Sequence, residues 1–366
     1  MTTQGHAGYL ARTYFPALDG LRALSIALVV LWHATEEQYY GWLHGFHGVT
    51  IFFVLSGFLI TTLLLREEDR HGAVSFRGFY LRRVFRILPL YYLVLAVYCV
   101  LILLARLQPD RLEAFQRALP FYTFYLSEFP HYLRFRAPFD LSWSLGIEEK
   151  FYLVWPALAF GLLTVIRSRL RVAAGLLLLT VLLPSSWGAT VFLRPYGLIL
   201  LGCVVALVMH APDGFNALRG LGRFQLPLLF GLLLSCVLVD EPKRWEIVVA
   251  LMSALLLIST LVAPEGMIAR FFSTAPLVKV GTISYGIYLI HQLCLNAVER
   301  VIPGTSLLGG TLLAIVGGAV SVGGALLLSR FVEQPLIRIG RRLAARPRAD
   351  DPVRSHLLAE PPRPTA

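Results

Sequence analysis

The chain has 366 residues, of which 57% are hydrophobic and 15% are charged, and its mean hydropathy is +0.68. Soluble domains are about 45–50% apolar and about 25% charged. This composition therefore excludes a disordered chain, a coiled coil and an ordinary cytosolic enzyme. The apolar residues form long blocks, which is typical of a multi-pass membrane protein whose helices contact the lipid bilayer. In such a protein the net charge of +11 indicates biased loop charge rather than nucleic-acid binding.

Ten stretches are long and apolar enough to predict membrane-spanning helices. They lie at about 18–35, 46–65, 88–105, 147–166, 172–186, 191–209, 224–239, 246–263, 280–298 and 307–329. The predicted fold is an all-α, polytopic helix bundle. It comprises an N-terminal cytoplasmic segment at 1–17, a transmembrane domain at 18–335 and a basic, Pro-rich tail at 336–366 that is expected to be disordered.

The orientation of the bundle follows from its basic residues. If both termini are cytoplasmic, the cytoplasmic segments hold 23 of the 33 Lys and Arg residues, which the positive-inside rule favours. The longest external loop, 106–146, is rich in aromatic residues, and it is either an aromatic belt at the membrane interface or a cover over an external pocket. The four cysteines lie in apolar runs without CxxC spacing, so neither a disulfide framework nor a metal site is expected.

Ionisable side chains inside spans are informative, because a charge at the bilayer centre costs at least about 2.5–3.5 kcal/mol. In the first span, Asp19 and Arg22 precede His33, which follows Arg22 by eleven residues. At 100° per residue, Arg22 and His33 share one helix face and lie about 16 Å apart along the axis. Taken alone, Arg22 could snorkel to the headgroups and His33 could be an interfacial residue. Their shared face instead favours a polar channel.

A second cluster, Arg82, Arg83 and Arg86, enters the third span from the cytoplasmic side. Three guanidinium groups at such an entrance suit a ligand that bears phosphates. The alternative is ordinary anchoring by inside-positive residues, which needs no ligand.

Two further groups lie in the fourth and ninth spans. Ser144 and Glu148 resemble a helix cap at the outer start of the fourth span, and only one of the adjacent Glu148 and Glu149 side chains is expected to face the core. The polar residues Ser284, Tyr288 and His291 form one stripe on the ninth span. That stripe is either part of a site or a structural hydrogen-bond set. Arg194, at the outer start of the sixth span, is a candidate partner of Glu148.

Together these segments resemble the bacterial membrane acyltransferase-3 family, the O-acyltransferases of the OafA type. The matching motifs are Phe15-Pro-Ala-Leu-Asp-Gly-Leu-Arg22 with His33, Phe53-Val-Leu-Ser-Gly-Phe58, Arg83-x-x-Arg86-x-x-Pro89, Trp143-Ser-Leu-x-x-Glu148, Ser284-Tyr-x-x-Tyr288-Leu-x-His291 and Glu333-x-Pro335. They occur in order from 15 to 335, so the resemblance covers nearly the whole chain.

The resemblance implies an enzyme of the bacterial cytoplasmic membrane. Such an enzyme transfers an acyl group, often acetyl, from acyl-CoA to a hydroxyl of a glycan or other sugar-containing acceptor. Acceptors in the family include O-antigen, exopolysaccharide, peptidoglycan, Nod factors and macrolides. It also implies that the Arg22 and His33 pair is essential to catalysis and that Arg83 and Arg86 bind the donor. No tightly bound cofactor is expected, because acyl-CoA is a substrate.

These residues suggest a mechanism in which a neutral His33 takes the proton of the acceptor hydroxyl. Arg22, or less directly Ser284 or Tyr288, would stabilise the oxyanion, and Glu148 would orient His33 or bind the acceptor. The competing class is a transporter or flippase that uses the same buried Arg and His as a substrate path. Such a protein would be expected to carry inverted repeats with broken spans, and the sequence has no convincing repeat.

Overall fold

The computed structural model describes residues 5–35, 39–184, 188–240 and 245–344, and these residues are helical with no β-strand among them. The helices in chain order are α1 (His6–Ala11), α2 (Pro16–Thr35), α3 (His47–His71), α4 (Phe76–Cys99), α5 (Leu112–Thr123), α6 (Glu128–Tyr132), α7 (Trp143–Pro156), α8 (Ile166–Leu182), α9 (Gly188–His210), α10 (Pro212–Leu218), α11 (Gln225–Leu238), α12 (Glu246–Val262), α13 (Met267–Phe272), α14 (Ala275–Thr282), α15 (Ser284–Glu299), α16 (Leu307–Leu328) and α17 (Gln334–Ala344). Short π-helical segments extend α4 (Val100–Leu104), α7 (Ala157–Leu162) and α16 (Ser329–Glu333).

Six helical stretches within the described residues are long and apolar enough to cross a membrane. They are Pro16–Thr35, Gly41–His71, Phe76–Leu104, Thr190–His210, Pro212–Leu238 and Leu307–Ala344. A span needs about 17–25 residues to cover the hydrocarbon core. The all-α membrane bundle expected from the sequence is therefore confirmed.

The other four predicted spans also coincide with helices, but these fall short of a span by length or by charge. α8 and α12 have 17 residues each and α15 has 16, while α7 contains the charged run at 148–150. Residues 185–186 of the fifth predicted span lie outside the described residues. The total of ten spans thus stays a prediction, as does the N-in/C-in orientation.

The core of the bundle is built on α3, which packs most extensively against α9. The two backbones come close enough that a Cβ atom on Gly57 of α3 would overlap the carbonyl oxygen of Ile199 on α9. A Cβ atom on Gly202 of α9 would likewise overlap the carbonyl oxygen of Val54. Small residues allow such close helix packing in membranes, so these two glycines set the distance between α3 and α9.

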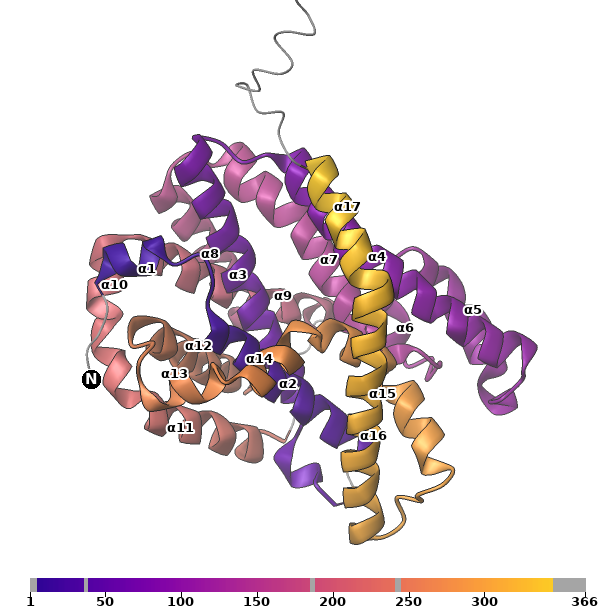
Figure 1. Ribbon diagram of the computed structural model, residues 1–366. Helices are drawn as coiled ribbons and strands as arrows, with labels where there is room; N and C mark the ends of the chain where they lie inside the picture. Colours follow the sequence, from indigo (N-terminus) through magenta and orange to yellow (C-terminus); the bar gives the residue numbers. More distant parts are fainter. Residues whose placement is uncertain (1–4, 36–38, 185–187, 241–244, 345–366) are drawn as a thin grey trace, which may run out of the picture.

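Helix α2 runs through the same core and contacts α3, α14, α15 and α16. α16 and α17 form one continuous helix, and in Figure 1 its yellow upper part lies alongside α4, which α17 contacts. Helical structure therefore continues to Ala344, inside the segment that the sequence assigned to the tail at 336–366, while 345–366 lie outside the described residues.

The aromatic segment 106–146 is not an extended loop but folds into α5, α6 and short turns. Its rings pack on α4 and on each other: Tyr125 lies 4.1 Å from Tyr91, and Phe139 lies 4.9 Å from Tyr98, between ring centroids. Phe139 has a positive φ of 70°, which is uncommon for a residue other than glycine. The segment is therefore a packed unit at one end of α4.

Candidate active site

A pocket of about 750 Å³ opens between the end of α3, the start of α4 and α17, and it is called here the arginine pocket. Six of its lining residues are arginines: Arg66, Arg70, Arg82, Arg83, Arg86 and Arg341. A guanidinium group presents a planar fork of donors that matches phosphate oxygens. The arginine pocket is thus suited to a polyanion.

The turn between α3 and α4 fixes one wall of this pocket. Helix α3 ends at Gly72, whose φ of +71° favours glycine, and Ser75 caps α4 by accepting a hydrogen bond from the backbone N–H of Gly78. Glu67 accepts from the backbone N–H of Ser75 at 3.0 Å and from Arg82 at 2.8 Å. Arg82 therefore lines the pocket with its charge already paired to a carboxylate.

A narrow channel of about 90 Å³ continues from the arginine pocket and shares Arg83 and Arg86 with it. Its other polar lining residues are Arg22, Ser56, Ser144, Glu148, Glu149, Tyr152, Ser284, Tyr285 and Tyr288. Together with Arg83 and Arg86 of α4, these residues come from five different helices, α2, α3, α4, α7 and α15. The channel is thus a polar path among helices that are otherwise apolar.

Charges inside the channel lie beside partners that orient them. Arg22 contacts Asp19 at 3.3 Å, and Glu148 accepts a hydrogen bond from the hydroxyl of Ser56 at 2.7 Å. The guanidinium of Arg83 stacks over the ring of Tyr152 at 4.8 Å. A buried polar or charged group without such partners would be costly, so these contacts lower the cost of placing polar side chains in the channel.

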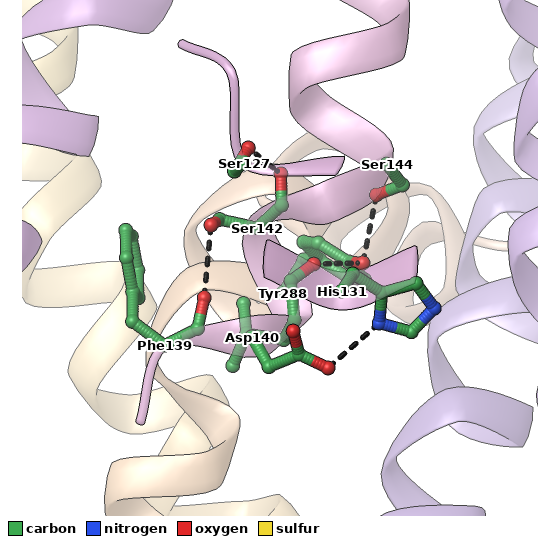
Figure 2. Close-up of polar contacts among 8 residues, drawn as sticks. Ser127, His131, Phe139, Asp140, Ser142, Ser144 and Tyr288 are labelled. Carbon is green, nitrogen blue, oxygen red and sulfur yellow. Dashed lines mark hydrogen bonds and ion pairs between the residues drawn. The ribbon is translucent and has the colours of Figure 1, made fainter. Parts of the chain in front are cut away.

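Tyr288 stands at the far end of the channel. Its hydroxyl donates to the carbonyl oxygen of Leu141 at 2.6 Å and accepts from the hydroxyl of Ser144 at 2.7 Å (Figure 2). Tyr288 also lines a second pocket beyond the channel. The two hydrogen bonds therefore hold a side chain that separates two compartments.

His33 lies in that next compartment, at the opposite end of α2 from Arg22. Its Nδ1 atom donates to the carbonyl oxygen of Val29 at 2.8 Å and lies 3.4 Å from Nε2 of the fully buried His291. Because a carbonyl oxygen only accepts, Nδ1 of His33 carries the proton and Nε2 keeps its lone pair. Nε2 is thus the ring atom of His33 that can accept a proton.

Two pockets meet at His33 and share His131, Leu141 and Trp143 as walls. The first, of about 710 Å³, lies between the segment 107–143 and the end of α15 and is called here the polar pocket. The second, of about 600 Å³, is lined by Trp32, Trp42, Phe46 and Tyr132 among others and is called here the aromatic pocket. His33 therefore faces a large space from the end of α2.

Most residues singled out from the sequence lie along this path. Those in the arginine pocket or channel are Arg22, Arg82, Arg83, Arg86, Glu148, Ser284 and Tyr288, while Asp19 contacts Arg22. His33 and His291 lie together beyond the channel, and Arg194 lines the aromatic pocket. The stripe on α15 therefore extends from the channel to His33.

Glu148 contacts Ser56 and lines the channel, whereas Arg194 and His33 line the pockets beyond it, and a pairing of Glu148 with either residue stays a prediction. One expectation for α7 is wrong. Both Glu148 and Glu149 line the channel, although only one of them was expected to face the core. The reason is that the channel runs along α7 from Ser144 to Tyr152, and adjacent residues line it, so an arc of at least 100° faces it.

Sequence reasoning missed several lining residues. Ser56 lies inside the Phe53–Phe58 motif, but a serine in an apolar helix gives no sign of its partner, Glu148. His131 and Asp140, which contact each other at 2.7 Å, lie in the aromatic segment, where only the aromatic residues drew notice. A histidine and an acidic residue in an external segment could have been noted as a candidate pair, although their spacing does not predict contact.

A family model described as an acyltransferase domain matches residues 15–330. The chain belongs to this acyltransferase family. It is similar to a peptidoglycan O-acetyltransferase of Listeria monocytogenes serovar 1/2a, with 30% identity over 362 residues that cover 90% of this chain and 57% of that protein. It is also similar to a candidate peptidoglycan O-acetyltransferase of Bacillus subtilis strain 168, with 32% identity over 317 residues that cover 76% of this chain and 48% of that protein.

The family model matches most of this chain, whereas the chain matches only part of each relative. The chain spans about half the length of the curated relatives it matches. No solved structure matches the chain significantly. The family assignment therefore rests on sequence, and the pockets described above are features of this chain.

Proposed function

We propose that this acyltransferase is a membrane O-acetyltransferase that moves an acetyl group from acetyl-CoA to a hydroxyl of a cell-surface glycan. The observation that carries the proposal is the path itself. An arginine-lined pocket, a narrow polar channel and a histidine with a free Nε2 follow one another through a bundle of apolar helices. The first relative is named a peptidoglycan O-acetyltransferase, and the second is a candidate for the same activity.

The donor would enter from the arginine pocket. Coenzyme A carries phosphates on its nucleotide and a thioester at the far end of a long arm, so the two ends need different surroundings. Arg83 and Arg86, at the mouth shared by pocket and channel, would hold the phosphates. The arm would occupy the channel and bring the thioester past Tyr288. With the N-in/C-in orientation, this entrance faces the cytoplasm, where acetyl-CoA is made.

The reaction would take place beside His33. Nε2 of His33 takes the proton from the acceptor hydroxyl while the oxygen forms a bond to the thioester carbonyl carbon. The hydroxyl of Tyr288, which lines the aromatic pocket together with His33, stabilises the negative oxygen of the tetrahedral intermediate. Arg22 lies about 16 Å from His33 along α2 and would contact the arm of the donor in the channel. The carbon–sulfur bond then breaks, and the leaving thiolate takes the proton back from His33. The products are an acetyl ester and free coenzyme A, and no covalent enzyme intermediate is needed.

The test uses membranes that contain the full chain, radiolabelled acetyl-CoA and peptidoglycan fragments. We expect label in the glycan with the native chain, and loss of that label with His33→Ala. His210→Ala is the matched control, because His210 lies at the end of α9, lines none of these pockets within the described residues and should keep activity.

Two results would count against the proposal. Near-normal labelling by a folded His33→Ala protein would remove His33 as the base. Movement of unlabelled glycan across vesicles made with the native chain, with no acetylated product, would favour a transporter instead.

A further inference from the structure

Three buried polar atoms in the wall of the polar pocket have no hydrogen-bond partner among the described residues. They are the hydroxyl of Tyr98, Oε1 of Gln108 and Oδ1 of Asp140. Tyr98 is only 3% exposed. Buried polar groups are nearly always hydrogen-bonded in proteins, so each exception needs an explanation. Three exceptions in one pocket indicate a ligand that supplies the missing partners.

The loop that carries Asp140 is held rigidly, as Figure 2 shows. The hydroxyl of Ser142 donates to the carbonyl oxygen of Phe139 at 2.8 Å, and that of Ser127 donates to the carbonyl oxygen of Ser142 at 2.8 Å. Tyr288 donates to the carbonyl oxygen of Leu141. The loop is therefore fixed on both sides of Asp140, which is the condition for a pre-organised binding group.

The Asp140 carboxylate divides its two oxygens between different tasks. Oδ2 accepts from Nδ1 of His131 at 2.7 Å, and the His131 ring stacks on Trp143 at 4.8 Å and 12° between ring planes. Oδ1 is left without a partner. Asp140 also lines the same pocket as His33. A group that reaches Oδ1 from the pocket would thus lie in the compartment that contains His33.

The chemistry of these atoms selects the kind of ligand. Oδ1 of Asp140 and Oε1 of Gln108 can only accept hydrogen bonds, and the Tyr98 hydroxyl can donate or accept. Two arginines, Arg111 and Arg300, also line this pocket, but three carboxylates line it with them, so its charged residues give no excess of positive charge to select an anion. An apolar ligand would leave all three atoms unpaired. A neutral ligand with several hydroxyl groups can donate to two of them and exchange a hydrogen bond with the third.

We propose that the polar pocket is the acceptor site and that it binds a neutral, hydroxyl-rich saccharide through Asp140, Gln108 and Tyr98. The assignment of this saccharide as the acetyl acceptor rests on the proposed function, whereas its binding does not. The aromatic pocket also reaches His33, but among its described lining residues there is no buried polar atom without a partner. The unpaired atoms therefore favour the polar pocket over its neighbour.

The experiment measures binding and transfer separately with the detergent-solubilised full chain. The binding probe is the tetramer of N-acetylglucosamine, and its Kd is measured by calorimetry without acetyl-CoA. Because a hydrogen bond to a charged group is strong, Asp140→Asn should raise this Kd about tenfold or more. Asp240→Asn is the matched control, since Asp240 lines the aromatic pocket, and its Kd should stay within about twofold of the native value.

Tyr98→Phe provides a second variant that removes one hydroxyl and no packing. It should also raise the Kd of the tetramer, while the Kd of acetyl-CoA stays unchanged in all three variants and shows that they are folded. Native Kd values for the tetramer in both Asp140→Asn and Tyr98→Phe would overturn the inference, as would weakened binding in Asp240→Asn alone. Failure of the native chain to bind the tetramer would also overturn it.

The two proposals fail in different ways. If the native chain binds the tetramer through Asp140 but transfers no acetyl group, the proposed function is wrong and the saccharide site stands. If it transfers acetyl to a glycan and Asp140→Asn leaves the KM for that glycan unchanged, the acceptor site is wrong and the proposed function stands.

Discussion

The three arginines at the start of α4 should contribute unequally to donor binding. Arg83 and Arg86 line both the arginine pocket and the channel, and both are half-buried. The side chain of Arg82 is 41% exposed and pairs with Glu67 at 2.8 Å. We therefore expect Arg83→Ala and Arg86→Ala to weaken acetyl-CoA binding much more than Arg82→Ala does.

The magnitudes follow from these environments. A hydrogen bond to a charged group contributes about 1.5–3 kcal/mol, and every 1.4 kcal/mol is a factor of about ten in affinity. Loss of Arg83 or Arg86 should thus raise the Kd of acetyl-CoA about 10- to 100-fold. An exposed ion pair is worth about 0–1 kcal/mol, so loss of Arg82 should raise the Kd by less than about fivefold.

The assay is equilibrium binding of acetyl-CoA to the solubilised full chain at fixed salt concentration, because phosphate contacts weaken as salt rises. Arg77→Ala is the matched control on the same helix, since Arg77 is exposed and lines none of these pockets within the described residues. The reasoning is refuted if Arg82→Ala has the largest effect of the three. It is also refuted if Arg77→Ala weakens binding as much as Arg83→Ala.

Three further predictions concern stability. Lys150 donates to Glu128, which is 4% exposed, and to two backbone carbonyls. Lys150→Met should lower the free energy of unfolding by about 3–5 kcal/mol, because it leaves that carboxylate unpaired. Adding Glu128→Gln should restore part of this loss in a chemical unfolding series. Gly57→Ala should destabilise by about 1–3 kcal/mol or more, because the methyl group overlaps the Ile199 carbonyl, and equal melting temperatures would disprove the close α3–α9 contact. Tyr98→Phe should leave the unliganded protein equally or more stable, because it removes an unpaired buried hydroxyl; a clear loss of stability would mean that the hydroxyl has a partner in the free protein.

The sequence by itself determined what is local. Hydropathy located the helices, because a span must be a continuous apolar run. The helical repeat placed Arg22 and His33 on one face of α2, and Ser284, Tyr288 and His291 on one face of α15, because every residue turns the helix by the same angle. The structure agrees, since the stripe on α15 lines the path from the channel to His33.

Only the tertiary structure decided which of these faces meet. The Glu148 contact with Ser56 joins residues 92 apart in sequence, and the His33 contact with His291 joins residues 258 apart. No repeat or spacing encodes such pairings, because they depend on how α3, α7, α2 and α15 pack around one another. For the same reason the sequence predicted His33 and the arginines as site residues but not the polar pocket, whose unpaired atoms come together only when the segment at 107–143 folds over the ends of α4 and α15.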